Sequence, residues 1–218
     1  LLVALLTAYL CDCALAPLHG TGYQSHEPSS ECFAALIVLM MPASISYPIV
    51  IAAVIVAVLV KEAFGGEGHY PFHPAAVGMV VAGVSWPKNV FFYPVPGTQL
   101  PLFGEVNTTV VAGMNATLRT GGLPSASTMN LLTGNVSAAV GTSAALVVMA
   151  CGLFLLVRGR IKLSVVLPFF IFVIGLPWLF PQLNELPAFS LPWEFIRQRI
   201  YLEKYVILSG TALFGGLF

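Results

Sequence analysis

The stretch KEAFGGEGHYPFHPAAVG, from Lys61 to Gly78, interrupts two apolar runs with glycines and prolines. Glycine permits backbone conformations that other residues avoid, and Pro74 suits the first turn of a helix. The stretch therefore predicts a close backbone approach followed by a short helix, in place of one continuous helix. His69 and His73 have the spacing of paired metal ligands on a helix, but Pro71 between them disfavours a regular helix there.

The composition of the chain indicates a protein that is solvated by lipid. Of its 218 residues, 58% are hydrophobic and 8% are charged, whereas a soluble domain carries roughly 25% charged residues. We therefore predict an all-α integral membrane protein, because helices satisfy their own backbone hydrogen bonds in hydrocarbon. Nine basic and nine acidic residues cancel, so the net charge indicates no nucleic-acid partner. Both ends lie inside apolar runs, which favours a fragment of a longer chain.

Apolar runs predict a polytopic helical bundle, since about 20 residues are needed to cross the hydrocarbon layer. The runs expected to be helical are Leu1 to Leu18, Phe33 to Met41, Ile45 to Val60, Ala75 to Val84, Val136 to Val157, Leu163 to Phe180 and a last one from Val206 onward. The second and fourth runs are too short to cross, which predicts broken half-helices beside a cavity or binding site. Ordinary helices with tolerated prolines are the alternative. We expect Val136 to Val157 to form one continuous span.

The runs divide the chain into three regions and give them an orientation. The regions are membrane helices with two half-helices over 1–84, a loop over 85–135, and membrane helices over 136–218 with an amphipathic interfacial segment at 189–205. Arg158, Arg160 and Lys162 follow a long apolar run, and such clusters mark the cytoplasmic side of a membrane. The loop 85–135 then lies on the outer side.

Two sets of polar residues allow both a functional and a structural reading. Cys11 and Cys13, with Cys32 brought near in space, could ligate a metal or an iron–sulfur cluster. Small, weakly polar membrane residues are the alternative for all three cysteines. Asp12, Glu62 and Glu67 lie near the ends of apolar runs, where they would serve an ion path or only solvate helix ends.

The segment FGGEGHYPFHPA, Phe64 to Ala75, resembles the signature FGG-x-G-x-x-x-F-N-P-A of a membrane flavoprotein family. That family comprises the D-type subunit of the Rnf-type ferredoxin:NAD oxidoreductase and the B-type subunit of the sodium-pumping NADH:quinone oxidoreductase. His73 stands where the family has asparagine. Looser resemblances at Ser29 to Pro42 and Leu208 to Phe218 extend the match over most of the chain. The resemblance implies a urea-transporter-like architecture with inverted repeats in a prokaryotic inner membrane.

The resemblance also implies a covalent flavin. The family joins FMN through its phosphate to a threonine within a pattern like S-[GTS]-A-T, and SAST, Ser125 to Thr128, stands in the corresponding place. Thr128 is then the attachment residue. Because the family's alanine is Ser127 here, attachment to Ser127 is an alternative. Related subunits hold a second, non-covalent flavin, riboflavin, and for this the resemblance suggests the glycines Gly65, Gly66 and Gly68.

The function implied by the resemblance is electron transfer within a multisubunit membrane complex. The chain would relay electrons through FMN between ferredoxin and NAD and couple this to sodium or proton transport. The implied partners are subunits of the A, B, C, E and G types, a flavin transferase, and ferredoxin and NAD through the complex. The sequence shows no catalytic constellation, so catalysis by this chain alone is not expected. The alternatives are the B-type subunit of the quinone-reducing complex and a flavin-free small-solute channel or transporter.

Overall fold

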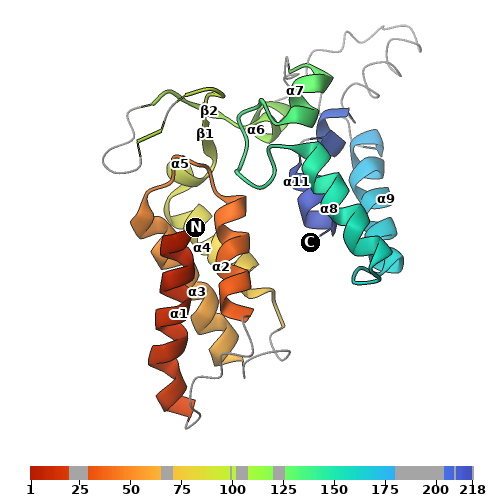
Figure 1. The fold of residues 1–218 in the computed structure, drawn as a ribbon. Coiled ribbons are helices and arrows are strands. Elements are labelled where there is room, and N and C mark those ends of the chain that lie inside the picture. Colours follow the sequence, from red (N-terminus) through yellow and green to blue (C-terminus); the bar gives the residue numbers. More distant parts are fainter. Residues whose placement is uncertain are drawn as a thin grey trace, which may run out of the picture. The chain divides into compact units, whose positions relative to one another are not determined.

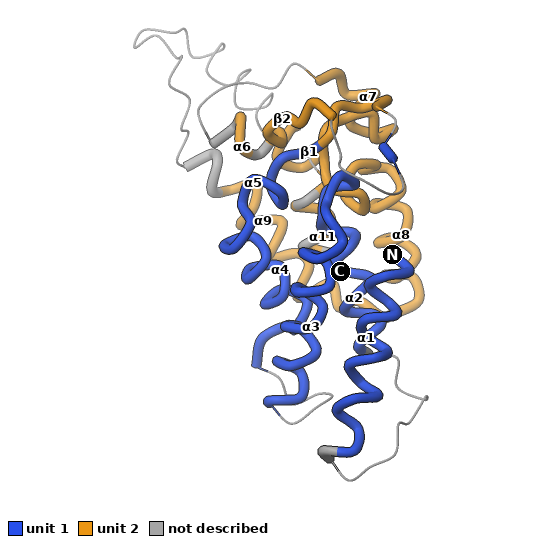
Figure 2. The backbone as a smooth tube through the Cα atoms, turned by 90° about the vertical axis from the view of Figure 1, so that its left-hand side faces the viewer, with its two compact units in different colours: residues 1–93, 100–106 blue, residues 94–99, 107–218 orange. Residues whose placement is uncertain are grey.

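The computed structural model describes residues 1–19, 29–64, 71–98, 100–101, 108–119, 126–179, 204–208 and 210–217. Most of these residues are helical (Figure 1). The chain divides into two compact units, one formed by residues 1–93 and 100–106 and the other by residues 94–99 and 107–218 (Figure 2). Each unit has its own packed helices and is described separately.

Unit 1 is built from helices that begin and end where prolines and glycines punctuate the apolar runs. Its elements are α1 (Leu2–Leu15), the 3₁₀ turn η1 (Ala16–His19), α2 (Ser29–Met40), α3 (Tyr47–Ala63), α4 (Pro74–Ser85) and α5 (Pro87–Val90). Pro48 lies in the first turn of α3 and Pro74 opens α4, where the missing N–H group costs no intrahelical hydrogen bond. The two runs expected to be short are short helices, since α2 and α4 each contain 12 residues.

Small residues allow the helices of unit 1 to approach one another closely. Its buried alanines come from all four long helices: Ala4, Ala8, Ala34, Ala53, Ala57, Ala75 and Ala82. At Gly78 on α4, a Cβ atom would lie 2.5 Å from the backbone oxygen of Ala53 on α3. The two helices are therefore in backbone contact at this point, and the buried side chains of Ile37 and Ala57 lie directly beside it.

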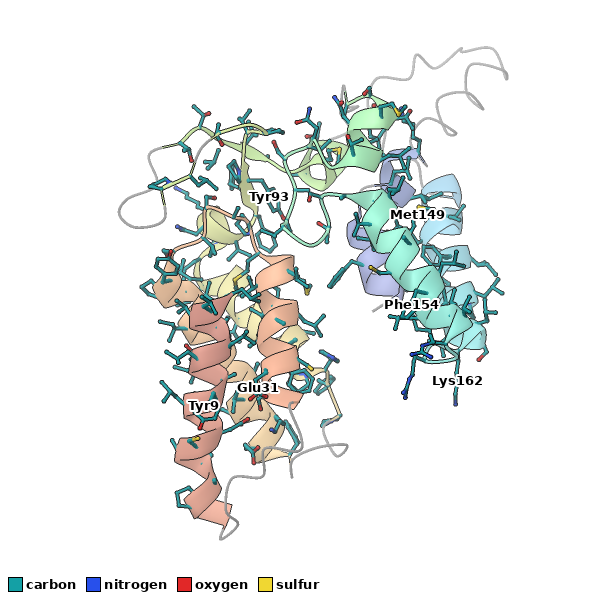
Figure 3. The ribbon with its side chains drawn as sticks, viewed as in Figure 1. Tyr9, Glu31, Tyr93, Met149, Phe154 and Lys162 are labelled. Carbon is teal, nitrogen blue, oxygen red and sulfur yellow. The ribbon has the colours of Figure 1, made fainter. Side chains whose placement is uncertain are left out.

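Unit 2 packs short helices around α8 and carries apolar side chains on its surface. Its helices are α6 (Met114–Arg119), α7 (Thr128–Thr133), α8 (Ala145–Val157), α9 (Leu163–Leu179), residues 204–208 and α11 (Thr211–Leu217). The last of these contacts both α8 and α9, and α7 contacts α8. On α8, Met149 and Phe154 are 47% and 60% exposed (Figure 3). A surface of this kind marks contact with another protein or with lipid.

Three observations differ from the expected pattern of spans, although the expectation of a mainly helical chain is confirmed. Val136 to Val157 is not one helix, because residues 136–144 form turns and α8 begins at Ala145. The hydroxyls of Thr142 and Ser143 donate hydrogen bonds to the carbonyls of Ala139 and Val140, a local pairing that competes with helix formation.

The second and third differences concern strands and helix length. The region expected to be a loop, 85–135, contains α5, α6, α7 and two short strands, β1 (Phe92–Pro94) and β2 (Val110–Ala112), which pair in a small sheet. Valines at the start of β2 favour extended backbone. Among the described residues, no helix combines the length and the hydropathy that crossing a membrane requires.

Replacing Gly78 by alanine tests the contact between α3 and α4. The added methyl group would meet a backbone oxygen that cannot move aside, so we expect Gly78→Ala to lower the free energy of unfolding by about 1–3 kcal/mol. Gly175→Ala in α9 is the control, because no heavy atom lies within 4 Å of the added carbon, and it should be neutral or slightly stabilising. Thermal unfolding in detergent measures both. Equal effects of the two variants would contradict the tight crossing.

Candidate functional site

Ser127 and Thr128, the two candidate attachment residues, lie at the start of helix α7. Ser127 is the N-cap residue, with extended backbone (φ −71°, ψ 155°). Its Oγ accepts a hydrogen bond of 3.2 Å from the backbone N–H of Asn130, which is the contact that a serine N-cap typically makes. The Ser127 hydroxyl is therefore engaged in holding the first turn of the helix.

Thr128 is the first residue of α7, and its side chain is exposed. The region 85–135 is expected to be a loop, whereas Thr128 lies at the start of a helix, where its side chain is still accessible. A helix can serve here because the first turn presents the side chain outward, while Leu131 one turn later is fully buried. Gly134 ends the helix in the left-handed conformation (φ 87°). The threonine thus lies on a short helix that is fixed at both ends.

A further hydrogen bond fixes Ala126, the residue before the N-cap of α7. The Oη of Tyr205 donates a hydrogen bond of 2.8 Å to the backbone oxygen of Ala126. Tyr205 is fully buried, although the sequence places it in an amphipathic segment at the membrane interface. Residues 189–203 of that segment lie outside the described part of the chain, so its place at the interface stays a prediction. No local pattern signals this contact, because 79 residues separate the two partners.

The remaining candidate residues for flavin binding lie outside the described residues: Ser125, Gly65, Gly66 and Gly68. The structure describes only the flanks of the glycine-rich stretch. His73 precedes α4 and lies edge-on against Phe33 of α2, with ring centroids 5.2 Å apart. The His73 side chain is exposed overall, and partial desolvation of the imidazole lowers its pKa, which favours the neutral ring at pH 7. His73, at the position where the family has asparagine, thus makes an aromatic contact with Phe33.

Unit 1 contains a second polar site, a charged network between α1, α2 and α3. Lys61 on α3 donates a hydrogen bond of 2.8 Å from Nζ to Ser30 Oγ on α2. Ser30, itself fully buried, donates one of 2.9 Å to Asp12 Oδ1 on α1. The Lys61 Nζ also lies 3.7 Å from Asp12 Oδ1 and 3.4 Å from Glu62 Oε1. Glu31, which follows Ser30 on α2 and is labelled in Figure 3, shows where this network lies.

This network is a structural site as well as a candidate ion site. The Lys61 side chain is only 10% exposed, and a buried ammonium group is stable only when carboxylates and hydroxyls replace its water. Asp12 and Glu62 were expected near the ends of apolar runs, but their common partner was not predicted. The third acidic candidate, Glu67, lies outside the described residues.

The cysteines do not form a metal centre in the described part of the chain. Cys11, Cys13, Cys32 and Cys151 are free thiols. Within the described ranges, no group of three or more His, Cys, Asp or Glu residues is arranged to hold a metal ion. His69, the partner of His73 in the proposed metal spacing, lies outside those ranges.

Removing the lysine from the charged network tests its contribution to stability. Lys61→Met would leave the Asp12 and Glu62 carboxylates without their shared cation, so we expect a loss of about 3–5 kcal/mol in the free energy of unfolding. Adding Asp12→Asn to this variant should restore part of the loss. The control is Lys162→Met in the exposed turn between α8 and α9 (Figure 3), expected within about 0.5 kcal/mol of the native protein. Unfolding in detergent that shows equal losses for the two lysine variants would contradict the network.

Comparison with known proteins confirms the resemblance seen in the sequence. The chain is 30% identical over 117 residues to the D subunit of the ion-translocating oxidoreductase complex of Colwellia psychrerythraea, an alignment that covers 51% of this chain and 33% of the relative. The protein of the same name from Actinobacillus pleuropneumoniae is 30% identical over 120 residues, covering 52% of this chain and 34% of the relative. That of Klebsiella pneumoniae is 27% identical over 123 residues, covering 53% and 35%.

The alignments span about a third of the length of these curated relatives. The family comparison covers more of the chain, since the sequence profile of the NQR2, RnfD, RnfE family matches residues 1–218. The match therefore includes both units and the start of α7. This chain belongs to the NQR2, RnfD, RnfE family.

Proposed function

We propose that this chain is part of the D-type subunit of an ion-translocating electron-transport complex and carries FMN covalently on Thr128. The family match over the whole chain and the names of three relatives support the type of subunit. The relatives named are D subunits, which favours the ferredoxin:NAD complex over the B-type subunit of the quinone-reducing complex. Electrons pass through the subunit between ferredoxin and NAD, coupled to sodium or proton transport.

Ser127 and Thr128 differ in the role of their hydroxyl groups, and we base the choice of attachment residue on this difference. Attachment needs a hydroxyl that a transferase can reach. Both side chains are exposed, but the Ser127 Oγ accepts the hydrogen bond from the Asn130 N–H that caps α7. Modification of Ser127 would alter the oxygen that caps α7, while modification of Thr128 leaves the cap in place. The geometry at the start of α7 thus fits a phosphoester on Thr128.

The attachment reaction requires an activated phosphate donor. In a flavin dinucleotide such as FAD, a phosphoanhydride bond joins FMN to AMP. Replacing this bond with a phosphoester to a hydroxyl group involves no redox change. The Thr128 oxygen bonds to the phosphorus on the flavin side, the anhydride bond breaks, and AMP leaves with the bridging oxygen. The hydroxyl proton is released to solvent or to a base of the flavin transferase. This chain supplies only the hydroxyl and the conformation that presents it.

Bound FMN supplies electron transfer in one-electron and two-electron steps. The protein's own contribution is to hold the attachment point still, and three features of unit 2 do so: the Ser127 cap, the buried Leu131 and the Gly134 stop. The exposed apolar surface of α8 and α9 fits contact with lipid or with other subunits of the complex, for which the A, B, C, E and G types are the candidates.

The same proposal places the chain in a prokaryotic inner membrane, with residues 85–135 on the outer side. The 12-residue helices α2 and α4 support a broken-helix architecture of the inverted-repeat, urea-transporter type, since helices of this length reach only part of the way through hydrocarbon. A non-covalent riboflavin at Gly65, Gly66 and Gly68 is part of the proposal. A flavin-free channel would share these helices, so the decisive property is the flavin itself.

Two substitutions at the start of α7 test the attachment residue. Thr128→Ala should abolish the adduct, because the acceptor oxygen is gone. Ser127→Asn should keep it, because asparagine caps a helix as well as serine does but offers no hydroxyl. The measurements are in-gel flavin fluorescence and intact mass of the full-length subunit, produced with its flavin transferase. Unmodified native protein would favour the flavin-free channel, and an adduct that survives in Thr128→Ala and disappears in Ser127→Asn would assign it to Ser127.

A further inference from the structure

Tyr205 connects the helical segment 204–208 to the residues just before helix α7. It is the largest of the fully buried side chains, and its hydroxyl donates a hydrogen bond of 2.8 Å to the carbonyl oxygen of Ala126. Ala126 directly precedes Ser127 and Thr128. A residue remote in the sequence therefore contacts the backbone immediately before the proposed attachment residue.

The segment that carries Tyr205 is itself fixed in position. Gly210 has a positive φ of 73°, and any Cβ atom at this position would overlap the backbone oxygen of Thr142. The segment is thus seated directly on the turn before α8. Lys204 also covers the tyrosine ring, with its Nζ 5.1 Å from the ring centroid. Because the Tyr205 side chain is fully buried, its ring has little room to move away from Ala126.

The bond to Ala126 controls the peptide plane that leads into Ser127. The carbonyl of Ala126 and the N–H of Ser127 belong to the same planar peptide group, so a fixed carbonyl restricts the backbone at Ser127. This orientation keeps the Ser127 Oγ 3.2 Å from the Asn130 nitrogen. While Ser127 caps the helix, its exposed Oγ is held toward the Asn130 N–H, whereas the Thr128 hydroxyl, also exposed, has no part in the cap.

We propose that Tyr205 is a positioning residue for flavin attachment, which presents Thr128 to the transferase and withholds Ser127. The inference rests on the proposed covalent FMN and adds a specificity-determining residue that neither the attachment pattern nor the family match includes. It predicts that loss of one hydroxyl group at position 205 slows attachment and also spreads it to the neighbouring serine. A residue that only filled the core would not affect which hydroxyl is modified.

Tyr205→Phe removes the hydroxyl and keeps the ring, and Thr98→Val is its matched control. Thr98 is half-buried in unit 2, and its hydroxyl also donates to a backbone oxygen, that of Val95, at 2.8 Å, but it is not among the residues that seat Tyr205 or cap α7. The full-length subunit, in its complex and unmodified, is purified from a strain without the transferase. Transferase and FAD are then added, intact mass gives kcat/KM for attachment, and peptide mass spectrometry locates the FMN.

For Tyr205→Phe we expect kcat/KM to fall roughly five- to tenfold, the size expected from losing one buried hydrogen bond. A measurable share of the FMN should also appear on Ser127. Thr98→Val should match the native protein in rate and site. Native kinetics and exclusive Thr128 attachment in Tyr205→Phe would overturn the role of Tyr205 alone, whereas native protein that accepts no FMN would overturn the proposed function instead.

A second probe covers the case in which Tyr205→Phe does not accumulate. Incorporation of 3-fluorotyrosine at position 205 keeps the hydroxyl and makes it a stronger hydrogen-bond donor. This protein should accept FMN at least as fast as the native chain and only on Thr128. Slow attachment, or FMN on Ser127, would overturn the proposal.

Discussion

The backbone contact between α3 and α4 at Gly78 is the constraint on which unit 1 depends. With no side chain at this position, α4 lies against the Ala53 carbonyl of α3, and the alanines of the neighbouring turns can pack without cavities. Helices at this separation need no large apolar residues between them, which explains a core rich in alanine. Packing of small residues also works in hydrocarbon, where burial of apolar surface provides little driving force.

Close packing of the helices in turn makes the charged network possible. Lys61 near the end of α3 reaches Ser30 on α2, and through it Asp12 on α1. Because moving one helix would separate these buried polar partners, the network restricts how the three helices can slide or rotate. Apolar contacts alone would tolerate several such arrangements, and the charges select one.

Much of the helical pattern could be predicted from the sequence, because apolar runs and prolines act locally. Pro74 marks the start of α4, as the sequence predicts. Hydropathy could not identify residues 136–144 as turns, because the hydroxyls of Thr142 and Ser143 pair with nearby carbonyls. The attachment pattern located Thr128, whereas the cap at Ser127 has a weak signal, because Asn130 stands where a capping box has glutamate or glutamine. Tyr205 and Ser30 act across long sequence separations, which no local pattern records.

The bond between Tyr205 and Ala126 has a consequence for the order of events during biosynthesis. The tyrosine lies 79 residues after its partner, and its segment is seated by Gly210 on the turn before α8. A nascent chain that has been synthesised only as far as α9 lacks Tyr205 and therefore this hydrogen bond. Under the proposed role, such a chain would be a poor acceptor of FMN. Fast and exclusive loading of Thr128 would then require a folded unit 2, and chains that end before Tyr205 would be loaded slowly and at both hydroxyls.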